Sequence, residues 1–170
     1  MKSALFHLSA WCAFFGFGAS AAISRDVRPE GLRDFAKLSG TVVVVLSPSC
    51  PCSKSHEPVL AELAKRFPSF GFVGLRADDE DGRKHFTADR LPFPVVARVG
   101  AASALGAMKT PHVFVFDSEG ALKYRGGVDD SHDASRARIP YLADALTALD
   151  AGAAPAYPET RPLGCRVNWE

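Results

Sequence analysis

The sequence predicts an α/β fold in which a central mixed β-sheet carries helices on both of its faces. A run of mostly β-branched residues, Thr41–Leu46, shows no polar alternation, which is typical of a central strand buried on both sides. The following segment, Ser53–Phe67, repeats its apolar residues at helical spacing. A second apolar run, Phe70–Leu75, comes soon after this helix. Strand, helix and strand in this order indicate a βαβ unit with parallel strands.

The remaining elements are shorter. Before the central strand, Gly31–Leu38 has helical spacing and predicts a short helix. After the βαβ unit we expect an extended piece, a small helix, a β-hairpin and an amphipathic helix, at Leu91–Ala97, Ala101–Met108, His112–Arg125 and Ile139–Leu149, respectively. This order of elements is that of a thioredoxin fold, with helices covering both faces of the sheet.

The domain organisation follows from these elements. We expect a thioredoxin-like domain at residues 41–150, preceded by a lead-in with the short helix at residues 22–40. Residues 151–170 contain three prolines, so they are expected to form an extended tail, which carries Cys165.

The first 21 residues resemble a secretory signal peptide. A positive start at Lys2 is followed by an apolar stretch, Ala4–Phe17, and by the small-x-small pattern of Ala19 and Ala21. This stretch is shorter than the roughly 20 residues that a membrane-spanning helix needs. We therefore expect residues 1–21 to be removed and the mature protein to be exported, periplasmic or extracellular, with no membrane span.

Charge and composition exclude one large class of function. The chain has 20 basic and 19 acidic residues, which gives a formal charge of +1, and no basic run is interleaved with aromatic residues. Nucleic-acid binding is therefore not expected.

Two cysteines that flank a proline carry the chemistry that the sequence suggests. Cys50 and Cys52 lie where the central strand gives way to the long helix, with Pro51 at the first helical position. A helix N-terminus favours negative charge, so it should lower a thiol pKa below the ordinary value of about 8.5. The thiolate is the reactive form of cysteine, so this turn indicates redox chemistry.

The cysteine count leaves the disulfide partner open. Removal of Cys12 with the signal peptide leaves three cysteines, so one thiol stays unpaired and disulfide exchange is favoured over a structural framework. Cys50 and Cys52 are too close in sequence to pair without distorting the turn. The alternatives are therefore a local Cys50–Cys52 disulfide or pairing of Cys50 with Cys165, which can be resolving, structural or idle.

His56 lies one helical turn after Cys52 and suggests a second chemistry. Cys50, Cys52 and His56 together offer two soft thiolates and an imidazole, a set that suits Cu(I). The alternative, which we favour, is that His56 is a polar residue beside the thiols that changes their pKa. No other cofactor is expected.

Several motifs along the chain resemble the exported redoxins of the AhpC/TSA type, in the thioredoxin-like superfamily. They are Ser49–Ser53, Leu91–Val96, Lys109–Asp117, Glu119–Gly126, Val128–Asp130 and Pro158–Cys165. The resemblance implies that Cys50 is the principal reactive thiol. It also implies that Pro111, after Thr110, is a cis-proline facing that thiol, and that Cys165 is a family-like C-terminal cysteine.

The resemblance and the cysteine turn together predict a thiol–disulfide oxidoreductase that acts on protein thiols or disulfides outside the cytoplasm. An alternative is a thiol peroxidase with peroxides as substrates and an antioxidant role. However, Val43 stands where peroxiredoxins have a proline. A Cu(I)-binding assembly factor and a redox-inert binding module are the alternatives from other classes.

Overall fold

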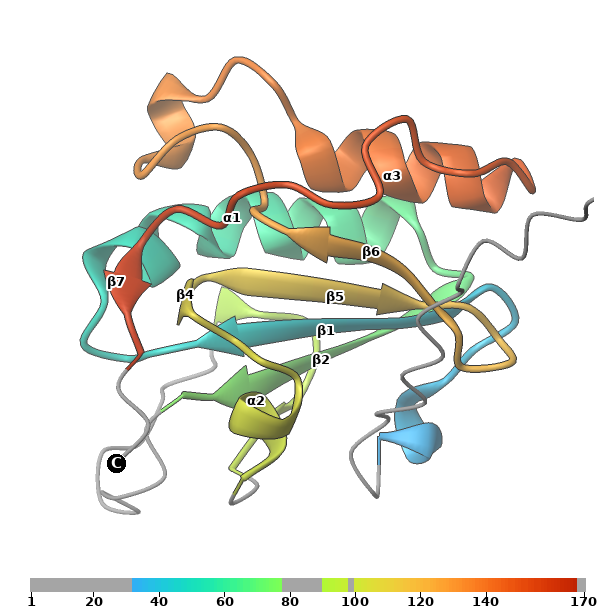
Figure 1. The fold of residues 1–170 in the computed structure, drawn as a ribbon, viewed down its shortest axis with the longest axis horizontal. Coiled ribbons are helices and arrows are strands. Elements are labelled where there is room, and N and C mark those ends of the chain that lie inside the picture. The colour runs from blue at the N-terminus through green and yellow to red at the C-terminus, as the bar shows by residue number, and fades with distance from the viewer. Residues whose placement is uncertain (1–31, 78–89, 98–99, 168–170) are drawn as a thin grey trace, which may run out of the picture.

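The structure, a computed structural model, describes residues 32–77, 90–97 and 100–167. The predicted signal peptide at residues 1–21 lies outside these ranges. Five strands form one sheet in the order β3-β2-β1-β5-β6 (Figure 1). They are β1 (Gly40–Leu46), β2 (Phe70–Arg76), β3 (Val95–Val96), β5 (His112–Phe116) and β6 (Leu122–Gly126). Strand β1 is parallel to β2 and antiparallel to β5, so the predicted mixed sheet is confirmed.

Strand β1 supplies both hydrophobic cores of the domain. All seven of its residues are buried, as the uninterrupted apolar run predicted. Val42 and Val44 belong to one core, and Val43 and Val45 belong to the other. Successive side chains of a strand point to opposite faces of the sheet, so β1 contributes to both layers.

Helices cover both faces of this sheet (Figure 1). Helix α1 (Pro51–Arg66) and helix α3 (Tyr141–Asp150) lie on one face, where Leu60 and Leu146 join the core that contains Val42. The short helix α2 (Ala101–Ala104) lies on the other face and adds Ala102 to the core that contains Val43.

Two helices are shorter than the sequence pattern predicted. In the described part of the predicted helix at residues 31–38 there is only a 3-10 turn, η1 (Arg33–Phe35), because Ala36 is extended. Leu38, which the helical pattern placed on the apolar face, is 91% exposed. Helix α2 ends at Ala104, because Gly106 adopts φ 69° and closes a Schellman motif.

A second, two-stranded sheet joins the C-terminal tail to the domain. Strand β7 (Cys165–Arg166) pairs antiparallel with β4 (Lys109–Thr110). Between α3 and β7 the chain forms no helix, and it runs back from the end of α3 past β6 (Figure 1). Cys165 and Arg166 therefore lie beside the segment that precedes β5.

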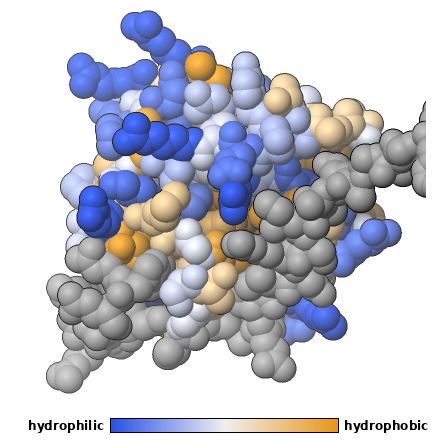
Figure 2. All heavy atoms as spheres, viewed as in Figure 1, coloured by the Kyte–Doolittle hydropathy of each residue, from blue (hydrophilic) through white to orange (hydrophobic). Residues whose placement is uncertain are grey.

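The surface is uneven in polarity. In the view of Figure 2, hydrophilic side chains gather at the upper left, near the loop that carries η3 (Ala134–Arg136). Met108 and Leu122 are exposed hydrophobic residues that line a cavity between α2 and the tail. Among the described helices, none has both the length and the apolar character required to cross a membrane.

Candidate active site

Cys50 lies at the junction between the central strand and the long helix. A tight turn after β1 is closed by the Cys50 N–H, which donates to the Ser47 carbonyl at 3.2 Å. Cys50 is the N-cap of α1 and Pro51 is in the first turn, as the sequence predicted. No acidic side chain occupies this turn. The unpaired N–H groups and the helix dipole therefore favour negative charge at the Cys50 sulfur.

Cys50 forms a disulfide with Cys165. Their Cα atoms are 6.0 Å apart although 115 residues separate them in the sequence. Cys52 is free and partly exposed, so the structure selects the distant partner of the two alternatives that the sequence left open. Cys50 is only 2% exposed, whereas Cys165 is partly accessible to solvent.

Contacts other than the disulfide also hold the tail in place. The Arg125 N–H donates to the Pro158 carbonyl, and the Thr160 N–H donates to the Arg125 carbonyl, each at 3.0 Å. The Thr160 hydroxyl lies 2.8 Å from the Tyr124 hydroxyl and accepts a hydrogen bond from the Gly127 N–H. These bonds fix the tail beside β6 before it reaches Cys165.

The tail passes very close to the loop that contains Pro111. The Thr110–Pro111 peptide bond is cis, the conformation that the motif resemblance implied. The Thr110 carbonyl oxygen lies 3.1 Å from the Cys50 sulfur. A Cβ atom on Gly164 would overlap this carbonyl, and Gly164 has φ 149°. Glycine at position 164 therefore allows Cys165 to approach Cys50.

Three sulfurs converge at this point. The sulfur atoms of Cys50, Cys52 and Cys165 all lie within 4.8 Å of one another. Nδ1 of His132 lies 3.9 Å from the Cys52 sulfur. The sequence pattern gave no signal for His132, because it comes from the loop between β6 and α3 and lies 80 residues from Cys52.

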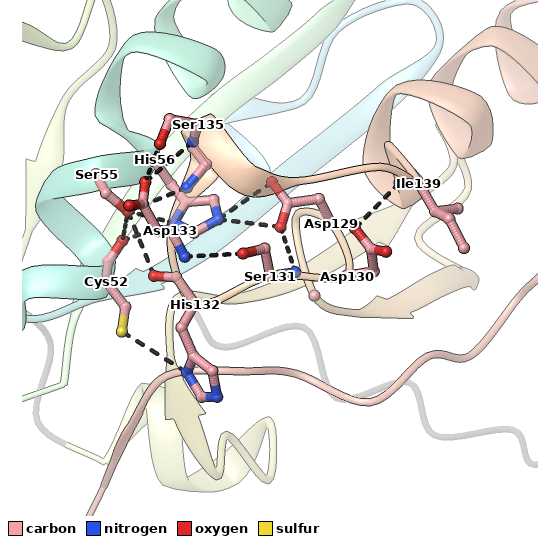
Figure 3. A network of polar contacts seen from close by, with 12 residues as sticks. Cys52, Ser55, His56, Asp129, Asp130, Ser131, His132, Asp133, Ser135 and Ile139 are labelled. Carbon is pink, nitrogen blue, oxygen red and sulfur yellow. Dashed lines mark hydrogen bonds and ion pairs between the residues drawn. The ribbon is translucent and has the colours of Figure 1, made fainter.

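His56 is not part of this sulfur group. Its ring is 1% exposed, and its Nε2 lies 3.2 Å from the Asp129 carboxylate. Its Nδ1 lies 2.6 Å from the Cys52 carbonyl oxygen (Figure 3). Within the described chain, the set of ligating side chains that come together is the three cysteines, without His56. The predicted Cu(I) set of Cys50, Cys52 and His56 is therefore not assembled in the structure.

The surroundings of His56 favour its protonated form. Burial alone would lower its pKa, but the hydrogen bonds to Asp129 and to the Cys52 carbonyl, with the charge of Asp129, raise the pKa above its ordinary value. Both ring nitrogens face oxygen acceptors, which only an imidazolium can satisfy with two N–H donors. Asp129 also accepts from the Ser131 N–H, so the pair ties the 129–135 loop to α1 (Figure 3).

From the sequence alone, Asp129 stands out only as part of the Val128–Asp130 motif. No role followed from the residues themselves, because its partner, His56, is 73 residues away in the chain. A buried acid and a buried histidine are the kind of pair that only three-dimensional contacts reveal.

Solved structures share this architecture. An uncharacterised conserved protein from Geobacillus kaustophilus is 24% identical, with a TM-score of 0.70 over 82% of each chain. A thioredoxin-like protein in its oxidised form is 18% identical, with a TM-score of 0.57 over 71% of this chain and 84% of that one. The chain has a thioredoxin fold. The strand order, the helix after β1 and the cis-proline loop beside Cys50 agree with this assignment.

A third neighbour with this fold is MTB dsbF in its mixed oxidised and reduced forms. It is 22% identical, with a TM-score of 0.51 over 66% of this chain and 82% of that one. No family model matches the sequence, and no curated protein is similar to it. These comparisons support the thioredoxin fold, and they leave AhpC/TSA membership as a prediction from the motifs.

The close approach of Gly164 predicts that Gly164→Ala will weaken the Cys50–Cys165 disulfide. The added Cβ would overlap the Thr110 carbonyl, and a left-handed backbone costs an L-residue on the order of 1 kcal/mol even in open space. In a glutathione buffer we expect the equilibrium constant for the disulfide to fall by about tenfold, equivalent to about 1.4 kcal/mol. Alkylation of free thiols followed by mass spectrometry measures this constant.

Gly152→Ala is the matched control for this prediction. Gly152 also has a positive φ, 74°, but nothing lies near its Cβ position. Its substitution should leave the disulfide equilibrium unchanged. If Gly164→Ala forms the disulfide as readily as the wild type, glycine is not required for the approach of the tail.

The His56–Asp129 pair predicts a specific dependence of stability on pH. A histidine whose folded pKa is raised contributes stability that is fully present below its unfolded pKa of about 6.5 and is lost as pH rises through the folded pKa. At pH 6, Asp129→Asn should lower the free energy of unfolding by on the order of 3 kcal/mol, because it removes one partner of a buried pair. The difference from the wild type should shrink as pH rises.

Urea unfolding at several pH values between 6 and 9 measures this effect. A Cys52→Ser background prevents thiol exchange at high pH. His132→Asn, a change to an exposed histidine in the same loop, should leave the pH dependence as it is. If the free energies of unfolding of Asp129→Asn and the wild type differ by the same amount across this pH range, His56 does not titrate as described.

Proposed function

We propose that this protein is a thiol–disulfide oxidoreductase that cycles Cys50 and Cys165 between a dithiol and a disulfide. The observation that carries the proposal is the disulfide between an N-cap cysteine and a cysteine of the docked tail, beside the cis-proline loop of a thioredoxin fold. The fold neighbour dsbF, known in oxidised and reduced forms, supports a redox role.

In the reduced protein, the Cys50 thiolate attacks one sulfur of a substrate disulfide. A new S–S bond forms to Cys50, the substrate S–S bond breaks, and the second substrate sulfur leaves as a thiolate. The helix N-terminus stabilises the attacking thiolate, because it carries positive partial charge.

Cys165 completes the exchange. Its thiolate attacks the Cys50 sulfur, forms the Cys50–Cys165 disulfide and releases the remaining substrate sulfur as a thiolate. The substrate has then gained two electrons and the protein has lost two. To regenerate the protein, one thiolate of a reducing dithiol attacks the partly exposed Cys165 sulfur, and Cys50 leaves as the thiolate that the helix stabilises. The second thiolate of the dithiol then attacks the sulfur bound to Cys165, so that Cys165 leaves as a thiolate and the dithiol becomes a disulfide.

Substrates of this exchange would be protein disulfides or thiols outside the cytoplasm. Two features support this location: the predicted signal peptide at residues 1–21, and a disulfide, a bond that persists in oxidising compartments. The motif resemblance supports membership of the AhpC/TSA-type redoxins, and this too is a proposal.

Three single substitutions test the proposed roles, with a disulfide-bonded model protein as substrate and a dithiol as reductant. Cys50→Ser should abolish turnover, because it removes the attacking sulfur. Cys165→Ser should stop at a mixed disulfide between Cys50 and the substrate, which mass spectrometry of the unreduced protein detects. Cys52→Ser is the matched control and should retain turnover. Full turnover by Cys50→Ser would refute the proposal.

A further inference from the structure

Cys52 does not take part in the proposed disulfide exchange, although its sulfur lies within 4.8 Å of the sulfurs of Cys50 and Cys165. Cys52 is free and partly exposed, and it is in the first turn of α1. Once the disulfide is reduced, three thiols converge at one point. We propose that the reduced protein binds one Cu(I) ion through the sulfurs of Cys50, Cys52 and Cys165.

The spacing of the sulfurs fits such a site. A metal–thiolate bond is about 2.3 Å long, so three sulfurs around one ion in a trigonal plane lie about 4 Å apart. The three sulfurs already lie within 4.8 Å of one another. Reduction lets Cys50 and Cys165 separate to this distance with small side-chain movements.

The donor set selects Cu(I). Soft thiolates favour Cu(I) and zinc, but a structural zinc site takes four protein ligands, and a zinc ion with three protein ligands needs a water as its fourth. In the described part of the chain, no fourth His, Cys, Asp or Glu side chain joins the group of three sulfurs. His132 contacts Cys52 at 3.9 Å but is not a member of that group. Three sulfurs are enough for Cu(I).

The location also reduces the repulsion among three thiolates. The sulfurs gather at the N-terminus of α1, whose first turn holds no acidic side chain. Cys52 and Cys165 are partly exposed, so an ion can reach the site from solvent. The buried Cys50 would form the inner side of the site.

Binding would depend on the redox state of the protein. In the oxidised protein two of the three sulfurs are joined to each other and offer no thiolate. A dithiol must first reduce this bond, giving two cysteine thiols and its own disulfide. Three thiols then bind one Cu(I) and release three protons. The bound ion in turn occupies Cys50 and Cys165, so it blocks their exchange with substrates.

Anaerobic titration of the full-length reduced protein with Cu(I), in competition with a chromogenic Cu(I) chelator, tests the proposal. We expect one ion per chain. Cys52→Ser and Cys165→Ser should each lower the affinity by more than about tenfold, a loss at least as large as that from removing an outer-shell partner. His132→Ala is the matched control and should bind as the wild type does. X-ray absorption should show three sulfurs at about 2.3 Å.

Several outcomes would overturn the proposal. They are wild-type affinity in Cys52→Ser, binding by the oxidised protein as tight as by the reduced protein, or a preference for zinc over Cu(I) in direct competition. Cu(I) binding requires a reducible disulfide but not disulfide exchange with substrates. The Cys52→Ser variant distinguishes Cu(I) binding from disulfide exchange, because it should lose Cu(I) binding and retain turnover. Turnover that fails in the wild type while Cu(I) binds would refute only the proposed function.

Discussion

The hydrogen bonds that hold the C-terminal tail against β6 and β4 determine which sulfur can reach Cys50. Backbone bonds at Arg125 and the hydroxyl contacts of Thr160 fix the tail well before Cys165. The pairing of β7 with β4 then places Cys165 opposite Thr110. Because these contacts do not involve sulfur, they can keep the two cysteines close in the reduced state as well. Disulfide exchange and metal binding both require this closeness.

The other half of the site depends on the central strand. Strand β1 is buried on both faces, and its side chains enter both cores, so its end point is rigidly held. The turn after Leu46 is short, and Cys50 therefore stands at a fixed position at the N-terminus of α1. The strand provides the rigidity, and the helix provides the positive end that favours a thiolate.

A buried ion pair connects this helix with the loop before α3. His56 contacts Asp129 with one ring nitrogen and the Cys52 carbonyl with the other. The same loop brings His132 to the Cys52 sulfur. The sequence had suggested His56 as a partner of the thiols. Its ring instead contacts the first turn of α1 through the Cys52 carbonyl and not through a sulfur.

Local sequence determined the elements whose signals lie within a few residues of one another. The uninterrupted valines of β1 and the apolar spacing of α1 predicted both elements, and Pro51 placed Cys50 at the helix N-terminus. Periodicity was misleading where backbone geometry intervened: the extended Ala36 and the positive φ of Gly106 shortened two predicted helices.

Only the tertiary structure decided the partner of Cys50, the role of His56 and the presence of His132 at the site. The residues concerned are 115, 73 and 80 positions from their partners, and no local pattern encodes such distances. Those contacts arise when the sheet, the tail and the loop before α3 pack together. The sequence thus determined where a reactive cysteine would stand, and the packed fold decided which groups surround it.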